Sequence, residues 1–555
     1  MIKPTLRQWI PLESASLFKI ITQCTSNTTV TKQSDNLNKR PIHRLCSLMR
    51  KEGAQSLWID EATPETDPEV KYEFTFLKKY FTSKGIDASL WAYKLIFVKD
   101  KIANPKNVNY KKITFLSCSI IVNYSTDKES NAYLLYSIAS IPQKHNFTDE
   151  ISMPLMNYYF HSAKDYTLTF NDSNGKNRSF KIRSAPFFQK NNITSFCMQS
   201  TLATILNNLS NNAKLILPNH INEIYGTPFG SDLLFDKDKV LKVIRKKRFH
   251  AGQIAFDQRN TETLFKFLSR KFGWPPSSSV YPWMESGFPG FIVFHTRSGV
   301  LHVVPMIGHT LNTDSWQPEA DIRYGRVVRF HFRSVSAWVD NFIIHDDNFG
   351  MYLCYPTAKL SEKKDVRYKQ AGKKKALKKS KRRYLIDHVI FITRENIKLN
   401  PDTLEIDLIG DIRNWFERNK YVSEKENYWL YRLINEKKAP LVSRTLSVDK
   451  NDYIRNLKKE DSEKKKIPNN LLRVIEKQLP NRFWLTEITL PDLYIANKSA
   501  LISIATTKNS DKQLFVRFPK LCYLLIKKDY YRIALPTGSH YKLFERPNDI
   551  PTYDW

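Results

Sequence analysis

The sequence predicts an α+β protein of several domains. In the central part of the chain, helix-type hydrophobic spacing comes first and strand-like runs follow, which is an α+β order. The chain has 555 residues, too many for one compact core, so two to four domains are expected. Its 33 Phe, 27 Tyr and 11 Trp supply ample core material, so disorder throughout the chain is not expected.

Changes in composition and in hydrophobic spacing divide the chain into five segments. The expected segments are a polar N-terminal segment (1–55), a β-containing accessory domain (56–184), a central α+β domain (185–358), a Lys/Arg-rich linker or loop (359–383) and a mixed, then strand-rich C-terminal domain (384–555). The accessory domain is assigned from strand-like runs, a helix near 72–82 and a hairpin around Asn-Asp-Ser-Asn-Gly.

The central segment has the clearest order of elements. Its expected helices are 197–209, 236–246 and 260–272, the last with a capping sequence at its start. Its expected strands include 290–295, 301–307, 327–332, 341–345 and 351–354. This order predicts a helical half followed by an antiparallel sheet.

Composition excludes several classes of protein. With 16 glycines and no convincing GxGxxG or GxxxxGK[ST] motif, a Gly-rich nucleotide-binding fold is not expected. The six cysteines lack CxxC spacing, which favours reduced thiols in the cytoplasm over a disulfide framework or a zinc ribbon. No apolar run approaches the length of a transmembrane helix, and the N-terminus lacks the features of a signal peptide.

The chain is strongly basic, with 87 Lys and Arg against 55 Asp and Glu and a formal net charge of +32. Such a surface attracts nucleic acid, acidic protein or anionic lipid. Between 363 and 383 there are twelve basic residues and one acidic residue. This run is either a solvated loop or a polyanion contact. Few aromatic residues are interleaved with it, which favours the solvated loop. The candidate contact residues are Lys373, Lys374, Lys375, Lys378, Lys379, Lys381, Arg382 and Arg383.

Cys197 is the candidate nucleophile. A polar loop ends at this cysteine, and an amphipathic helix begins there, with Leu202, Ile205 and Leu206 on its buried stripe. A thiol at a helix N-terminus faces unpaired backbone N–H groups and the positive end of the helix dipole, which favour the thiolate. A core cysteine is the alternative interpretation.

Two later segments offer partners for this thiol. His302 begins a strand that Gly308 is expected to end, and a histidine there can form a thiolate–imidazolium pair with a cysteine. His309, just after the glycine, is the reserve base. Another strand ends in Asp346 and Asp347, and either carboxylate can hold the far nitrogen of the imidazole. The sequence leaves the choice between the two aspartates open.

Gln189 lies eight residues before Cys197. A glutamine amide beside the nucleophile can join the Cys197 backbone N–H in an oxyanion hole. A metal site at His345 and Cys354 is not expected, since no second pair has ligand spacing.

The order of Gln189, Cys197 on a helix, His302 in His-Val-Val-x-x-Ile-Gly and a strand ending in Asp346 resembles the papain-like cysteine peptidases. The nearest branch is the leader-peptidase domains of bacteriocin exporters and their free-standing bacterial relatives. The resemblance covers about 185–358, a third of the chain. It departs at Met198, where many relatives carry Gly, and at Asp347, where many carry Pro.

The resemblance implies a papain-like central domain that cleaves a peptide or isopeptide bond through a Cys-His-Asp triad and a thioester. Cys197 would be the nucleophile, His302 the base, Asp346 the orienting residue and Gln189 the oxyanion residue. The substrate would be a peptide or protein, and no metal or organic cofactor is needed. Transfer to an amine would use the same residues. The alternative function is a basic nucleic-acid-binding or sensing protein in which the papain-like domain is a non-catalytic scaffold.

Overall fold

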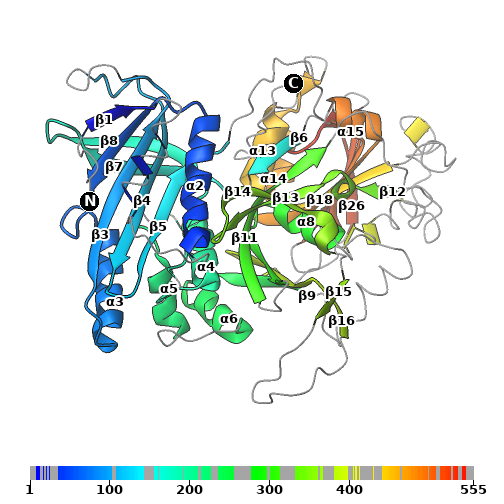
Figure 1. The fold of residues 1–555 in the computed structure, drawn as a ribbon. Coiled ribbons are helices and arrows are strands. Elements are labelled where there is room, and N and C mark those ends of the chain that lie inside the picture. Colours follow the sequence, from blue (N-terminus) through cyan, green and yellow to red (C-terminus); the bar gives the residue numbers. More distant parts are fainter. Residues whose placement is uncertain are drawn as a thin grey trace, which may run out of the picture.

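The computed structural model contains helices and mainly antiparallel sheets, in agreement with the predicted α+β class (Figure 1). It describes residues 8–12, 35–102, 108–142, 156–160, 162–191, 193–210, 214–226, 235–255, 277–296, 301–312, 332–360, 363–366, 381–397, 441–459, 461–462, 465–497, 499–507, 513–526, 529–535 and 540–545, with isolated positions in 17–25 and 404–430. None of the helices among these residues combines the length and the apolar character needed to span a bilayer.

The N-terminal part is an antiparallel five-stranded sheet in sequential order. Its strands are β1 (Gln8–Pro11), β2 (Ser56–Glu61), β3 (Ser89–Val98), β4 (Phe115–Ser125) and β5 (Ser130–Ala139). The apolar runs of β4 and β5 are nearly continuous because both faces of the sheet are covered. Helix α2 (Asp35–Lys51) packs in the hydrophobic cluster on one face, and α3 (Pro68–Ser83) packs in the cluster on the other.

A hairpin of β7 (Lys164–Asn171) and β8 (Asn177–Ser184) follows this sheet. Three helices come next: α4 (Cys197–Leu209), α5 (Pro218–Tyr225) and α6 (Lys237–Lys246). Their apolar residues join the same hydrophobic cluster as α3 and the N-terminal sheet. The helical half of the predicted central domain therefore shares a core with the predicted accessory domain.

The central sheet has the order β14-β13-β11-β10-β17-β9, and β6 also pairs with β11. Its strands are β6 (Met156–Phe160), β9 (His250–Ala255), β10 (Gly290–His295), β11 (Leu301–Asn312), β13 (Asn341–Asp346), β14 (Gly350–Pro356) and β17 (Ile386–Thr393). The short helices α8 (Ser277–Glu285), η3 (Val335–Trp338) and η4 (Thr357–Leu360) accompany this sheet.

The third sheet has the order β12-β18-β21-β23-β24-β25-β26. Its strands are β12 (Phe332–Ser334), β18 (Leu441–Asp449), β21 (Arg482–Thr489), β23 (Ile502–Thr507), β24 (Gln513–Phe518), β25 (Leu521–Ile526) and β26 (Asp529–Ala534). The associated helices are α13 (Lys450–Lys459), α14 (Asn469–Gln478) and α15 (Pro491–Asn497). Two-stranded pairs complete the fold: β15 (Lys363–Val366) with β16 (Lys381–Tyr384), β19 (Asp461–Ser462) with β20 (Lys465–Lys466), and β22 (Ser499–Ala500) with β27 (Tyr541–Lys542).

Strand pairing crosses the predicted segment boundaries. β6 comes from the predicted accessory domain, and β17 comes from the predicted C-terminal domain, but both lie in the central sheet. β12 comes from the predicted central domain and pairs in parallel with β18 of the third sheet. In the predicted polar segment 1–55, β1 and α2 pack on the N-terminal sheet (Figure 1).

Most of the predicted elements are present, with one correction that concerns the site. The strand that carries His302 does not end at Gly308, since β11 continues to Asn312. Gly308 lies opposite Phe160 of β6, and a Cβ there would lie 2.0 Å from the Tyr159 carbonyl oxygen. The glycine therefore permits the close approach of β6 instead of ending the strand. The helix predicted at 260–272 and most of the strand predicted at 327–332 lie outside the described residues.

Candidate active site

Cys197 is the first residue of α4, as the sequence predicts. Helix α4 is buried along almost its whole length, whereas Cys197 itself is only half-buried. The Thr201 hydroxyl, one turn further along, donates to the Val303 carbonyl of β11 at 3.1 Å. This bond joins the first turn of α4 to the strand that carries His302.

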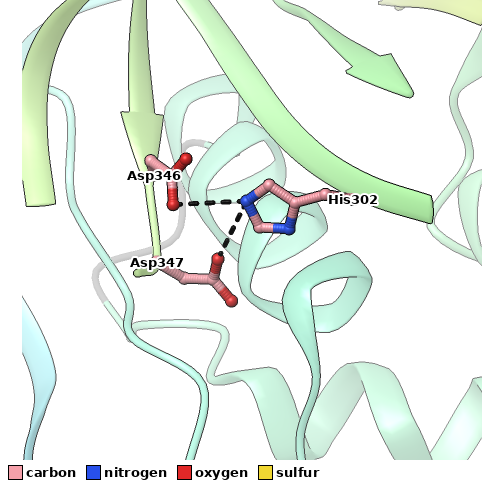
Figure 2. Close-up of side chains that lie close together, drawn as sticks. All are labelled: His302, Asp346 and Asp347. Atoms are coloured by element: carbon pink, nitrogen blue, oxygen red, sulfur yellow. Dashed lines mark hydrogen bonds and ion pairs between the residues drawn. The ribbon is translucent and has the colours of Figure 1, made fainter. Parts of the chain in front are cut away.

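His302 connects the thiol to the end of β13. Its Nε2 lies 3.2 Å from Asp346 Oδ1 and 3.5 Å from Asp347 Oδ1 (Figure 2). The Cys197 side chain also interacts with the imidazole and contributes to the raised pKa of His302. Burial lowers the pKa of His302, but the hydrogen bond to Asp346, the interaction with Cys197 and the two carboxylate charges outweigh burial and raise it well above its usual value. The site therefore favours an imidazolium.

Both aspartates reach His302 because the β13–β14 pairing is irregular. Strict alternation would place consecutive side chains on opposite faces of the strand, but the register shifts between Ile344 and Asp346. Asp346 also accepts a hydrogen bond from the Asn348 N–H at 2.8 Å. Burial raises the pKa of Asp346, but the hydrogen bond and charge of His302 outweigh it, so the pKa is lowered.

Asp347 differs from its neighbour in its electrostatic surroundings. Burial raises its pKa, and the opposing charges of Lys190 and His302 only partly offset this effect. Of the two carboxylates, Asp346 lies closer to the ring nitrogen and is the better ionised. The geometry thus favours Asp346 as the orienting carboxylate and brings Asp347 into the same site.

Lys190 is a site residue that the sequence analysis did not identify. Its Nζ lies 3.6 Å from Asp347 Oδ2, and its side chain is 18% exposed. Burial lowers the pKa of Lys190, but the charges of Asp347, Cys197 and Asp346 outweigh burial and raise it. The ammonium group is therefore part of the charge balance around the thiol. Lys190 directly follows Gln189 in the sequence, and this position is the feature that could have identified it as a site residue.

Gln189 is buried and anchored to the edge of the N-terminal sheet. Its Oε1 accepts a hydrogen bond from the Leu134 N–H at 2.9 Å, and its own N–H donates to the Leu134 carbonyl at 3.2 Å. Because Leu134 takes the carbonyl end of the amide, Nε2 is the donor end that an oxyanion would use. The oxyanion role of Gln189 stays a prediction.

The loop before Cys197 is held by Asn191. The Asn191 Oδ1 accepts from three successive backbone N–H groups at 2.9, 2.8 and 3.0 Å, those of Ile193, Thr194 and Ser195. Its Nδ2 donates to the buried Glu73 of α3 at 2.8 Å and to the Thr194 hydroxyl at 2.7 Å. One amide therefore fixes the chain that leads into the nucleophile and ties it to the N-terminal sheet assembly.

Helix α5 supports the same loop from another side. The Phe196 N–H donates to Gln199 Oε1 at 3.1 Å, and Gln199 Nε2 donates to Asn222 Oδ1 at 3.4 Å. Asn222 in turn donates to the Thr194 carbonyl at 3.0 Å. These bonds hold the backbone of the residues that directly precede Cys197.

A pocket opens beside the thiol. Its lining comprises Phe196, Cys197, Met198, Gln199, Tyr225, Phe235, Leu301 and Val303. Leu301 and Val303 are the chain neighbours of His302, so the pocket lies between the first turn of α4 and the strand of the imidazole.

His309 does not belong to this site, which corrects its prediction as a reserve base. Its Nε2 lies 3.7 Å from Glu285 Oε2, and its ring stacks on Tyr159 with centroids 5.3 Å apart. Glu285 also forms a buried ion pair with Arg444 of β18. The physical reason is the continuation of β11 beyond Gly308, which carries His309 into the contact with the C-terminal part.

The two aspartates and His302 are also a candidate metal-binding group, since their ligand atoms lie within 4.8 Å of one another. One feature favours an ion-pair network over a metal centre: Lys190 already supplies a cation to Asp347.

The structure tests the predicted polyanion run only in part. Lys381, Arg382 and Arg383 lie on β16, whose backbone pairs with β15. Lys373, Lys374, Lys375, Lys378 and Lys379 lie outside the described residues.

Comparison with known proteins adds no family to this description. The chain matches no family model, no curated protein and no solved structure.

Proposed function

We propose that this protein is a papain-like cysteine peptidase that cleaves a peptide or isopeptide bond through Cys197, His302 and Asp346. The observation that carries this proposal is the imidazole of His302, which is hydrogen-bonded to Asp346 and whose pKa is raised in part by the nearby Cys197 side chain. A thiol at a helix start, an imidazole and an orienting carboxylate are the parts that thiol acyl transfer needs.

In the proposed first step, the Cys197 thiolate attacks the carbonyl carbon, and the negative charge moves to the carbonyl oxygen. The Cys197 N–H and Gln189 Nε2 are the proposed donors to this oxyanion. His302 gives its proton to the leaving nitrogen, the C–N bond breaks, and an amine and a thioester result.

In the second step, His302 removes a proton from water as the water oxygen attacks the thioester. The C–S bond breaks, the acid leaves and the Cys197–His302 pair is restored. Asp346 keeps Nε2 occupied throughout, so that the other ring nitrogen, Nδ1, serves the thiol and the substrate.

Labelling with an iodoacetamide or epoxide-type probe tests the proposal. We expect rapid labelling of wild type, none at this position in Cys197→Ser, and strongly slowed labelling in His302→Ala. His309→Ala is the matched control, since this buried histidine lies away from the site, and its labelling rate should stay close to that of wild type. Equal, slow labelling of all six cysteines in wild type would contradict the proposal.

A further inference from the structure

The pocket beside Cys197 is small, and most of the residues that line it are apolar or aromatic. Met198, Leu301 and Val303 give it an aliphatic wall, and Tyr225 and Phe235 give it an aromatic one. Because Cys197 itself is part of the lining, a group in this pocket lies next to the proposed nucleophilic residue. An apolar side chain of a peptide gains free energy by leaving water for such a surface.

The aromatic wall is attached to the start of a strongly basic helix. The Tyr225 hydroxyl donates to the Asp236 carbonyl at 3.3 Å and accepts from the Asp236 N–H at 3.1 Å. The Lys239 ammonium lies 5.6 Å from the centroid of the Tyr225 ring. The rim of the pocket therefore carries a cation that is fixed next to the aromatic wall.

Positive charge continues along α6 and just beyond it. Positions 237–248 hold seven basic residues and one exposed acid, Asp238. Four of the basic residues are exposed and the others partly so: Lys242, Arg245, Lys246 and Arg248, then Lys237, Lys239 and Lys247. The Asp236 carboxylate caps the helix, where it accepts from the N–H groups of Asp238 and Lys239 at 3.0 and 3.1 Å.

We infer that the substrate of the proposed peptidase is an acidic protein segment, with a small apolar side chain next to the cleaved bond and carboxylates that lie along α6. This inference rests on the proposed function and adds the class of substrate to it. The apolar pocket selects one side chain, and the basic helix attracts and orients the flanking acidic residues.

A peptide fits these observations better than a nucleic acid does. Both polymers are attracted by positive charge, but the thiol at the edge of the pocket acts on an acyl carbon, which a peptide carries and a phosphodiester chain does not. The aliphatic wall also gives an apolar side chain a complementary surface.

Lys239→Glu is the variant that tests the charged rim. Lys239 is the third residue of α6, and an acidic residue in the first turn is compatible with the helix dipole, so the helix should still form. Lys79→Glu is the matched control because it changes the net charge equally at an exposed position on α3.

Binding is measured with the full chain carrying Cys197→Ala, so that no cleavage is needed. Two fluorescent peptides with the same central alanine, one flanked by glutamates and the other by lysines, are compared by anisotropy. We expect the acidic peptide to bind more tightly, and its affinity to fall with rising salt. Lys239→Glu should weaken its binding about threefold to tenfold, and Lys79→Glu should leave it unchanged.

Equal affinity for the two peptides, or equal effects of the two variants, would overturn the inference. It would also fail if a fluorescent oligonucleotide bound in a manner sensitive to Lys239→Glu while the acidic peptide did not bind. The proposed function is judged separately, by probe labelling of Cys197. Labelling without a preference for acidic peptides would refute only the substrate class, and acidic-peptide binding without labelling would refute only the peptidase.

Discussion

The buried carboxylate of Glu73 offers a sharp test of how the nucleophile loop is held. Glu73 Oε1 accepts from the Tyr133 hydroxyl at 2.7 Å and from Asn191 Nδ2 at 2.8 Å, and Oε2 accepts from Asn219 Nδ2 at 2.7 Å. These partners come from the N-terminal sheet, the nucleophile loop and helix α5. Glu73→Leu introduces an apolar side chain of similar length and removes both acceptor oxygens, and with them all three hydrogen bonds.

The expected cost follows from these three bonds. Each buried donor left without a partner costs about 1–3 kcal/mol, and burial of the leucine side chain returns about 2 kcal/mol. The free energy of unfolding should therefore fall by roughly 4 kcal/mol, which lowers Tm by about 8–16 °C for a cooperative folding unit of about 150–250 residues. Since Asn191 loses one of its anchors, alkylation of Cys197 should also slow.

Glu73→Gln is the matched variant, and we expect it to behave nearly as wild type. Its new amide nitrogen would face the donor group of Asn219, but Asn219 Oδ1 is buried without a hydrogen-bond partner. A half-turn of the Asn219 amide presents this oxygen to the new donor and restores the bond.

The raised pKa of Glu73 fixes the direction in which the stability of the folded protein should change with pH. Burial raises the pKa of Glu73 above its usual 4.5, so the folded protein holds this proton more tightly than the unfolded chain. Wild type should therefore lose stability relative to Glu73→Gln as pH rises from about 4.5 through the raised value. Thermal unfolding followed by circular dichroism, with iodoacetamide rates in parallel, measures both effects. If Glu73→Leu matched wild type in Tm and in labelling rate, the carboxylate would not hold the loop.

Three further predictions concern the site and its supports. Asp346→Asn should lower kcat by about 10-fold, because it keeps an acceptor for Nε2 but removes the carboxylate charge that stabilises the imidazolium, and Asp347→Asn should have a smaller effect; steady-state kinetics on one peptide compares them. At pH 7, iodoacetamide should alkylate Cys197 first, and mass spectrometry can compare its rate with that of the exposed Cys354. The other four thiols should react slowly because burial raises their pKa to about 12: Cys24, Cys46, Cys118 and Cys522. Arg444→Met should cost about 3–5 kcal/mol in thermal unfolding, because it removes the cation that the buried carboxylates of Glu285 and Glu487 share; an unchanged Tm would contradict this.

The sequence predicted those parts of the site that depend on local chain geometry. A polar loop followed by helical spacing placed Cys197 at a helix start, and alternating strands placed His302 and Asp346 at strand ends. The bulge before Asp346 was not predictable, because it arises from pairing with β14 and not from the residues of β13 alone.

Long-range contacts explain what the sequence did not show. Asn191 and Glu73 are 118 positions apart, and nothing in the spacing of either segment indicates that they bond. Strand pairing crosses the predicted segment boundaries for a related reason. Composition changes mark where local character changes, whereas β6 and β17 were placed in the central sheet by pairing with β11 and β10.

The positive charge of Lys190 explains how two adjacent aspartates can lie in one buried site. In the proposed resting state, the imidazolium of His302 is already balanced by the Cys197 thiolate, so two ionised carboxylates would leave a charge of −2 in a largely buried site. An unpaired buried charge costs several kcal/mol, and the Lys190 ammonium beside Asp347 reduces the total to −1. Lys190 directly follows Gln189, so a single loop delivers the proposed oxyanion donor and the cation that the second aspartate requires. The Gln-Lys pair before the nucleophile and the Asp-Asp pair after the strand are therefore better understood as one electrostatic unit than as four separate residues.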